Sequence, residues 1–476
     1  MTARSFANDY AVEAGWVLAW DGGRPALWRD AHVIVSGGRF ADVRPGPFTG
    51  DLPRLAAPHD ILLPGFISGH THVASGTPTR GIIEGAGSSR PSAHAVAALS
   101  DDELDDLTAY NLAEILRAGC TTQLEMSQNL RQAESYVRVA TKWGVRGYPG
   151  GMIPATPKVD AIWARRDDKV LFDSVPDTLA EIEANRRFGL DHMNAADGLI
   201  KPMLAPHATD THTPETMQAM KRAADELGTG LHFHIAQSPV ESERVHRLWG
   251  MSPVAWIGSF GMYEGPVFGA HMQALDWPDD ARILNDAGAV YVHCPSAGGA
   301  GGATQPYPEA LGAGMNVNIG LDTHSNDYVE NMKLAVIAGR ARSRLVADRH
   351  SGPVALPTIE DAIAGATTVA ARGLRRDDIG RIAVGAWADF VTIDLGGFLV
   401  GGGALPPEPL HNLLYANGLS VRHVATAGRV QVMDGRLVVA DEDEIARRGG
   451  AVVAKVWESL GREGRFAHPH RALTGG

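Results

Sequence analysis

The sequence predicts an α/β protein, a TIM-like (β/α)8 barrel with a small composite β-sandwich domain built from both chain ends. Eight apolar runs rich in β-forming residues recur through the middle of the chain, and helical stretches lie between most of them. Short alternating runs at each end are too few to bury a sheet face alone, so we expect the two ends to pair. A length of 476 residues suits a large barrel with an accessory domain.

Four segments make up the predicted domain organisation. The first and third form the β-sandwich, the second forms the barrel, and the fourth forms a C-terminal helix and tail. An Asp434-Gly435 pair between two alternating runs predicts a hairpin in the third segment. Two independent flaps are the alternative to a shared sandwich. The segments are 1–60, 61–378, 379–440 and 441–476.

The predicted barrel strands are short apolar runs, with helical stretches between most of them. The stretch SDDELDDLTAYNLAEILRAG is typical of these helices, since acidic residues fill its first turn and Gly119 ends it. The eight runs begin at Ile61, Thr121, Val145, Leu199, Gly230, Pro266, Ala289 and Asn316.

Composition and charge exclude several classes of partner. The formal net charge of -12 argues against nucleic acid, because phosphate binding requires a basic surface. No apolar run near the N-terminus resembles a signal peptide or a membrane span, so we expect a cytoplasmic protein without a membrane partner. The cysteines, Cys120 and Cys294, are too few for a disulfide framework and indicate a reducing compartment.

Polar residues follow most of the predicted strands at the point where each strand ends. Active sites of (β/α)8 barrels form at the C-terminal ends of the strands, so we expect these side chains to share one rim. They are His70, His72, His207, His234, Gln237, His271, His293 and Asp322.

The His70-Thr71-His72 segment places two imidazoles on the same side of an extended chain, because strand side chains alternate with a period of two. Alone, such a pair is more often structural. Here the strand PGFI leads directly into the pair, and His234 and Asp322 follow other strands. Three histidines and one aspartate suit a single divalent metal ion, with zinc as the first choice and iron or cobalt as alternatives.

The successive strand-end motifs resemble those of the amidohydrolase superfamily. PGFISGHTH resembles its opening signature, and APHATDTHTPETM, HFHIAQ, GAHMQALD, VHCPS and IGLDTHSND are similar to motifs of its mononuclear-metal branch. GAWADFVTID is similar to the motif by which the chain returns to the accessory sandwich. That branch includes cytosine, guanine, S-adenosylhomocysteine and 8-oxoguanine deaminases and atrazine chlorohydrolase. The resemblance extends from about Trp16 to Val439.

The resemblance implies a role for each residue of the rim. Asp322 would take a proton from the water that the metal activates, and His271 would polarise the substrate or stabilise an oxyanion. His207 and His293 would line the substrate pocket. Relatives are often dimers or larger, so we expect a homo-oligomer, although the sequence carries no interface signature. The implied metal ligands are His70, His72, His234 and Asp322.

The predicted substrate-contacting histidines also have structural interpretations. His207 could stabilise the loop that it begins, and His293 could simply cap its strand. His324 lies two residues past Asp322, where it could contact substrate or be exposed.

Three other residues are not assigned to the chemistry. His232 is interpreted as structural and as facing away from His234. Cys294 is not expected to be a nucleophile, because nothing around it would activate a thiolate. The binuclear branch bridges two metals with a carboxylated lysine, but Lys201 begins its strand, so we expect no second metal.

Gln237 is the main departure from the family pattern. Deaminases of this branch have a glutamate three residues after the histidine of the fifth strand, and that glutamate moves a proton to a ring nitrogen. A glutamine amide hydrogen-bonds to substrate but carries no proton at neutral pH. The loop 297–303 departs as well, because its glycines supply backbone freedom and no side-chain recognition.

These observations favour a hydrolase of a C–N bond in an amide, urea or (thio)carbamate of a small neutral molecule. A carbonyl carbon needs no protonated ring nitrogen before attack, so Gln237 is compatible with this chemistry. One alternative is an aminohydrolase or dechlorinase of an N-heterocycle such as a triazine, purine or pyrimidine. The other is a catalytically silent binding protein on the same fold.

Overall fold

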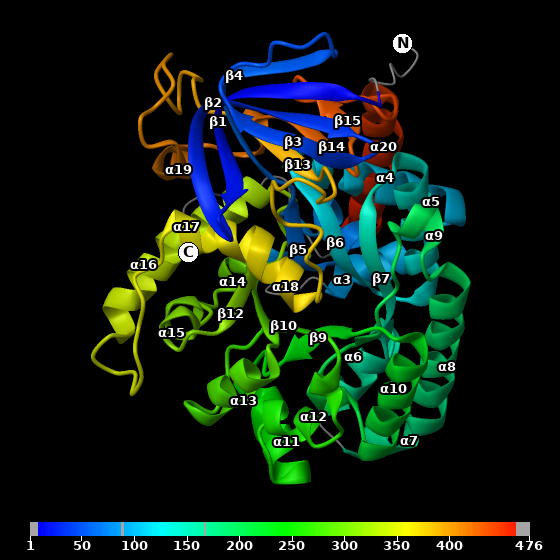
Figure 1. Cartoon of the computed structure of the whole chain (residues 1–476). Helices are drawn as coiled ribbons and strands as arrows, with labels where there is room; N and C mark the ends of the chain where they lie inside the picture. The colour runs from blue at the N-terminus through cyan, green and yellow to red at the C-terminus, as the bar shows by residue number, and fades with distance from the viewer. Residues whose placement is uncertain (1–7, 87–89, 166–167, 463–476) are drawn as a thin grey trace, which may run out of the picture.

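Eight parallel strands form a closed barrel in the computed structural model, which describes residues 8–86, 90–165 and 168–462 (Figure 1). Strands β5 to β8 form one sheet and β9 to β12 another, each in sequence order. Parallel bridges join the two sheets, from Ala208 to His234 on one side and from Thr71 to Asp322 on the other. The strands are β5 (Phe66–Thr71), β6 (Cys120–Ser127), β7 (Arg146–Ile153), β8 (Ala205–Pro206), β9 (Leu231–Ile235), β10 (Val267–His271), β11 (Val290–His293) and β12 (Asn316–Ile319).

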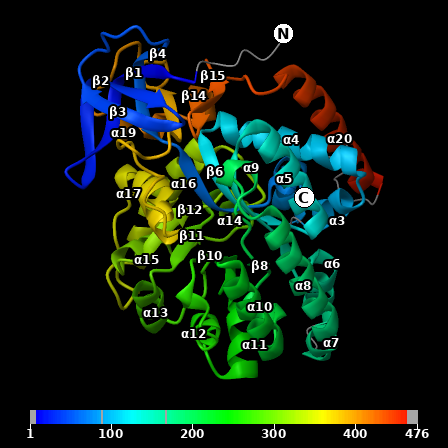
Figure 2. The same cartoon turned by 45° about the vertical axis from the view of Figure 1, so that its right-hand side comes forward.

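Helices surround the barrel (Figures 1 and 2). Helix α4 (Asp101–Arg117) begins with a capping box, in which Ser100 and Glu103 each accept the other's backbone N–H. Helix α5 (Leu130–Trp143) ends at Gly144, whose φ of 71° turns the chain out of the helix. Further helices are α3 (Arg90–Ala97), α6 (Thr156–Arg165), α7 (Asp168–Asp173), α8 (Val175–His192), α10 (Pro214–Leu227), α11 (Pro239–Trp249), α12 (Pro253–Gly258), α13 (Asp279–Ala287), α14 (Pro295–Ala300), α15 (Tyr307–Gly312), α16 (Tyr328–Val346) and α17 (Ile359–Ala364). Four-residue helices are α1 (Gly76–Thr79), α2 (Ile83–Ala86), α9 (Ala195–Gly198), α18 (Ala370–Gly373) and α19 (Pro409–Asn412).

Both chain ends build one eight-stranded sheet beside the barrel, at the top of Figure 1. Its order is β16-β15-β14-β13-β4-β1-β2-β3, so N-terminal and C-terminal strands meet where β4 pairs with β13. The sheet curls onto itself, because the rings of Phe40 and Phe390 lie 6.5 Å apart although their strands are not neighbours. This closure buries a separate core and gives the composite sandwich that the sequence predicts. The strands are β1 (Tyr10–Asp21), β2 (Arg24–Ser36), β3 (Arg39–Pro45), β4 (Arg54–Pro64), β13 (Phe390–Asp394), β14 (Val421–Thr426), β15 (Arg429–Met433) and β16 (Arg436–Leu437).

Two of the predicted barrel strands differ in extent. The run from Ile61 divides at Gly65, so that its first four residues end β4 of the accessory sheet and its last two begin β5. The predicted boundary after residue 60 therefore falls inside β4. The run from Leu199 is a strand at Ala205–Pro206, because its two prolines cannot donate hydrogen bonds to a neighbouring strand.

Helix α20 (Glu442–Arg462) packs against α3 and α4 on the outside of the barrel (Figure 2). Its buried Val456 and Leu460 share a core with Leu107 of α4. The helix lies where the sequence predicts one, and the predicted tail after it, 463–476, is outside the described residues. In the described part of the chain, no helix is both long enough and apolar enough to cross a membrane.

Candidate active site and metal centre

The four predicted metal ligands lie together at the C-terminal end of the barrel strands. His70 and His72 come from the end of β5, His234 from β9, and Asp322 from the segment after β12. The Nε2 atoms of His70 and His234 are 3.1 Å apart. Asp322 Oδ1 lies 3.7 Å from His72 Nε2 and 4.0 Å from His70 Nε2.

Backbone carbonyls fix the tautomer of two of these imidazoles. His72 Nδ1 donates to the Met126 carbonyl at 2.5 Å, and His234 Nδ1 donates to the His207 carbonyl at 2.5 Å. Each Nε2 therefore turns its lone pair toward the centre, as in metal-binding histidines. Burial also lowers the pKa of His70, His72 and His234, so these rings stay neutral and able to coordinate.

The donor set fits one divalent metal ion. Ligand atoms lie within 4.8 Å of one another in three overlapping groups of described residues. The groups are His70, His72 and Asp322; His70, His234 and His271; and His271, Cys294 and Asp322. Neutral imidazoles with one carboxylate match the ligands of catalytic zinc sites. All of these side chains are buried or nearly so, which restricts competition by water.

Gln305 determines which nitrogen of His271 carries the proton. Gln305 Nε2 donates to His271 Nδ1 at 3.1 Å, so the proton of the neutral imidazole is on Nε2. That Nε2 lies 3.6 Å from Asp322 Oδ2. Gln305 is itself oriented, because its Oε1 accepts from His293 Nδ1 and from the Cys294 N–H, each at 2.8 Å. His271 therefore presents a hydrogen-bond donor beside the Asp322 carboxylate.

Asp322 has an unusual backbone conformation. Its φ is 57°, in the left-handed region that residues other than glycine rarely adopt. Its N–H donates to the His70 carbonyl at 3.1 Å, and its carbonyl accepts from the His72 N–H at 3.2 Å. The carboxylate is therefore fixed by backbone bonds to the segment that carries the two histidines.

A cavity of about 320 Å³ opens over this centre, a volume at the small end of ligand pockets. Helix α6 lines one wall with Thr156, Val159, Asp160 and Trp163, whose spacing places them on one helix face. His94 of α3 pairs with Asp160, with 2.5 Å between Nε2 and Oδ2. The described lining residues include neither lysine nor arginine, so none of them offers a fixed cation to an anionic substrate.

The cavity brings together several of the predicted substrate residues. His207, Gln237 and His271 line it. The His207 ring lies between Trp163 and His234, with centroids 4.8 Å and 5.1 Å away. Gln237 Nε2 is buried without a hydrogen-bond partner in the described part of the chain, so its amide has a donor free for substrate.

His293 and His324 lie outside the described lining of this cavity. His293 bonds to Gln305 behind His271, and its ring stacks on Tyr307 at 4.7 Å. His324 pairs with Glu84 at 2.5 Å and lines a neighbouring cavity, because the chain turns away from the metal centre after Thr323. The substrate contacts expected of these two histidines gain no support from their positions.

His232 faces the same side as His234, contrary to the sequence-based expectation. Side chains two residues apart on a strand share one side. His232 is fully buried, and burial together with the nearby His72 lowers its pKa to about 3. Burial raises the pKa of the Cys294 thiol well above its usual value, which fits its exclusion as a nucleophile.

Sequence reasoning missed Gln305 and the α6 face. Gln305 lies in an irregular segment after the glycine-rich loop, where no pattern distinguishes it. Asp160 and Trp163 do follow a helical spacing in TPKVDAIWAR. That spacing identifies a helix face, but it does not reveal what the face contacts.

Comparison with known proteins agrees with this geometry. The amidohydrolase family matches residues 61–430. The chain is 30% identical to the 5-methylthioadenosine/S-adenosylhomocysteine deaminase of Symbiobacterium thermophilum over 471 residues, which cover 95% of this chain and 98% of the relative. It is 32% identical to the 5'-deoxyadenosine deaminase of Methanopyrus kandleri over 260 residues, 52% of this chain and 56% of that protein.

Solved structures share the fold. A zinc-bound adenosine deaminase from Xanthomonas campestris superposes with a TM-score of 0.77 at 23% identity, over 94% of this chain and 99% of the other. The atrazine chlorohydrolase of Arthrobacter aurescens TC1, complexed with zinc, gives 0.76 at 20% identity, over 93% and 100%. The fold, the family and the hydrolase class predicted from sequence are thereby confirmed. The chain belongs to the amidohydrolase family.

Proposed function

We propose that this chain hydrolyses a carbon–nitrogen bond at a carbonyl carbon, in an amide, urea or (thio)carbamate of a small neutral molecule. The observation that carries the proposal is Gln237, an uncharged amide in the cavity next to His234. A carbonyl carbon accepts a nucleophile without prior protonation of a ring nitrogen. An amide that binds but transfers no proton is sufficient for this reaction.

The proposed metal ligands are His70, His72, His234 and Asp322. We propose zinc as the ion, with iron or cobalt as alternatives, and the zinc named for the adenosine deaminase and the atrazine chlorohydrolase supports this choice. When bound, the ion lowers the pKa of a water molecule and so supplies a nucleophile near neutral pH.

Asp322 and His271 carry the proton and the charge in the proposed reaction. The Asp322 carboxylate accepts a proton from the attacking water and passes it to the leaving nitrogen. His271 Nε2–H, whose tautomer is fixed by Gln305, donates to the oxyanion that develops on the carbonyl oxygen. The 3.6 Å between His271 Nε2 and Asp322 Oδ2 allows both groups to contact one reacting centre.

The cavity supports a neutral substrate. Its described carboxylates are Asp160 and Asp322, and His94 accompanies Asp160 at the wall formed by α6. With neither lysine nor arginine in the described lining, a phosphate or free carboxylate on the substrate would be desolvated without a partner. Gln128, Thr156 and Gln273 offer neutral hydrogen bonds instead.

Deamination of an adenine-type nucleoside is the second candidate. The deaminase relatives support it, because one of them matches nearly the whole chain. This reaction would require a proton donor other than Gln237, and we propose His207 or His271, both of which line the cavity. Because the described lining holds no lysine or arginine, we expect such an enzyme to prefer 5-methylthioadenosine over S-adenosylhomocysteine, which carries a free carboxylate.

A turnover screen tests the proposal. Protein loaded with zinc, iron(II) or cobalt(II) would be incubated with neutral amides, ureas and (thio)carbamates, and in parallel with adenosine-type nucleosides and chlorinated or aminated triazines. Mass spectrometry separates the reactions, because amide cleavage divides the molecule whereas deamination replaces an amino group by oxygen. Turnover of nucleosides or triazines with none of any carbonyl compound would refute the first proposal in favour of the second.

The homo-oligomer expected from the sequence stays a prediction. Light scattering on the purified chain measures its mass in solution, and a monomer at all concentrations would contradict that expectation.

A further inference from the structure

Two side chains on α4, the buried Asn111 and the partly exposed Glu114, contact the two segments that follow the metal ligands. Asn111 is fully buried, and its Oδ1 accepts from the Thr77 N–H at 2.8 Å and from Asn326 Nδ2 at 3.0 Å. The Thr77 hydroxyl lies 2.9 Å from the same oxygen. Thr77 belongs to the segment after His72, and Asn326 to the segment after Asp322. We call Asn111 and Glu114, one turn apart on α4, the α4 clamp.

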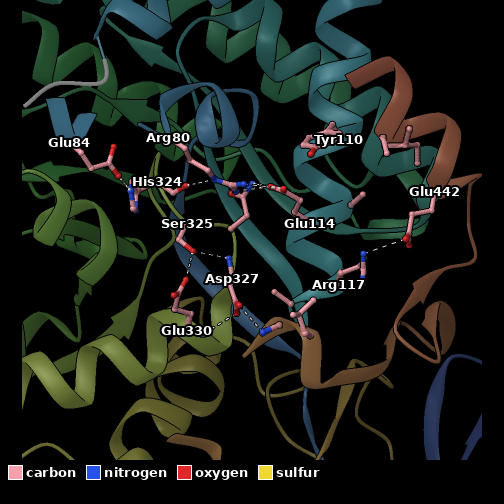
Figure 3. A pocket seen from close by; sticks show the side chains of 17 residues that line it. Arg80, Glu84, Tyr110, Glu114, Arg117, His324, Ser325, Asp327, Glu330 and Glu442 are labelled. Atoms are coloured by element: carbon pink, nitrogen blue, oxygen red, sulfur yellow. Dashed lines mark hydrogen bonds and ion pairs between the residues drawn. The ribbon is translucent and has the colours of Figure 1, made fainter. Parts of the chain in front are cut away.

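Glu114 makes the second set of these contacts, and Figure 3 shows it facing Arg80. Its carboxylate accepts from Asn326 Nδ2 at 2.8 Å and from the Thr77 hydroxyl at 3.0 Å. Arg80 holds the same carboxylate with two bonds of 2.7 and 3.1 Å, and also donates to the His324 carbonyl at 3.2 Å. Glu114 therefore bonds to Thr77 and Arg80 of the segment after His72, and to Asn326 of the segment after Asp322.

The segments are tightly packed where they reach the clamp. A Cβ added to Gly76 would lie 2.7 Å from Asn326 Oδ1 and 3.0 Å from Asn111 Oδ1, so the backbone approaches the clamp as closely as glycine permits. The Thr79 hydroxyl also bonds to the carbonyls of Gly76 and Thr323. Thr79 thus ties the two segments to each other.

The clamp lies close to the metal ligands along the chain. Gly76 follows His72 by four residues, and Asn326 follows Asp322 by four. Asp322 has a φ of 57°, and an unfavourable backbone conformation of this kind persists only where the surroundings hold it. The Asp322 carbonyl accepts from the His72 N–H, so a shift of either segment moves both ligands.

We propose that Asn111 and Glu114 are positioning residues for the metal centre. They hold His72 and Asp322 at one separation by fixing the chain segments that follow them, and contact neither metal nor substrate. The inference rests on the proposed metal site. Loss of the clamp is expected to weaken metal binding and to alter the ligand field, while the barrel stays folded.

The test compares a variant of the clamp and a variant of its partner Asn326 with a matched variant in the neighbouring cavity. Glu114→Gln keeps the shape of the side chain but weakens its bonds to Arg80, and Asn326→Ala removes the shared donor. Glu442→Gln is the control, because Glu442 lines the same cavity as Glu114 and pairs with Arg117 at 3.3 Å, but lies on α20 (Figure 3). Chelator competition with Co²⁺ gives the affinity, the visible Co²⁺ spectrum reports the ligand field, and calorimetry of the metal-free protein reports folding.

Glu114→Gln and Asn326→Ala should each lose roughly 10-fold in Co²⁺ affinity, the lower end of the effect of outer-shell partners. Their Co²⁺ spectra should change, whereas Glu442→Gln should match wild type in both measurements. Wild-type affinity and spectrum in a folded Glu114→Gln or Asn326→Ala protein would overturn the inference. Failure of the wild-type chain itself to bind any divalent ion would overturn the proposed metal site first, and the inference with it.

Discussion

A Gln237→Glu substitution would replace the neutral amide of the cavity with a carboxylate of the same length. The Gln237 Nε2 has no hydrogen-bond partner among the described residues, so the change breaks no structural bond made by that side chain nitrogen. The backbone N–H of Gln237 donates to Glu241 Oε2 at 2.8 Å, and the substitution of the side chain leaves this bond in place. The effect on activity therefore reports on chemistry in the cavity.

The magnitude follows from the role of the amide. If the substrate is a carbonyl compound, Gln237 supplies one neutral hydrogen bond of about 0.5–1.5 kcal/mol, so Gln237→Ala should slow turnover by about 2- to 13-fold. Gln237→Glu adds a negative charge next to the metal centre and should raise the pKa of the attacking water. A shift of one unit, about 1.4 kcal/mol, leaves roughly a tenfold smaller reactive fraction below that pKa.

The assay is kcat/KM against pH for wild type, Gln237→Ala and Gln237→Glu, on the best substrate from the screen. We expect Gln237→Glu to be slower at neutral pH and its profile to move to higher pH. In a heterocycle deaminase the new carboxylate would instead serve as the proton shuttle, an effect of about 10²–10⁴-fold. A clear gain by Gln237→Glu on a nucleoside or triazine, without wild-type turnover of carbonyl compounds, would refute the reasoning.

Three further predictions concern the general base, its neighbour and a buried acid of the accessory sheet. Asp322→Ala should reduce kcat by about 10²–10⁴-fold even in protein that retains metal, which kinetics together with metal analysis would check; near-normal activity would remove it from the mechanism. Gln305→Met should lower kcat by roughly 10-fold in folded protein, because His271 loses the bond that fixes its tautomer, and should lower Tm as well, because the buried Cys294 N–H loses its acceptor; an unchanged kcat would contradict the role of Gln305 toward His271. Burial raises the pKa of Asp60 from 3.8 to about 6, so the folded state holds that proton more tightly and stability falls as pH rises through this window. Asp60→Asn should therefore raise the free energy of unfolding at pH 7 by up to about 3 kcal/mol, measured as a higher Tm, and leave Tm nearly unchanged at pH 4. An equal gain in Tm at both pH values would contradict the linkage.

The barrel and the convergence of the four proposed ligands could be predicted because each of them follows an apolar strand. The β5 segment enters the His70-Thr71-His72 motif directly, and the period of two places both imidazoles on one side. Strand ends meet at one rim in this fold, so Asp322 could be placed near His72 although the two residues are 250 positions apart in sequence. In the structure Asp322 Oδ1 lies 3.7 Å from His72 Nε2. Local pattern and fold topology were enough for these residues.

The same logic fails where a side chain is oriented by tertiary contacts. His293 ends its strand like the other histidines, but stacking on Tyr307 and a bond to Gln305 hold it behind His271. His324 lies two residues past Asp322, yet its partner is Glu84 and it faces the neighbouring cavity. Neither partner is adjacent in sequence, so spacing alone cannot reveal them.

The identity of the residue after the fifth strand matters more because Glu241, a buried carboxylate four residues further on, does not take the place of a glutamate at position 237. Glu241 is buried, and its oxygens accept from the N–H groups of Ala236 and Gln237 and from both the N–H and the hydroxyl of Thr209. Burial and the neighbouring Asp210 raise its pKa. These bonds hold the loop that presents Gln237, and Glu241 is not among the described residues that line the cavity. A carboxylate whose oxygens already accept hydrogen bonds from this loop, away from the cavity, cannot also transfer protons to a substrate. The choice between carbonyl hydrolysis and ring deamination therefore depends on the amide of Gln237.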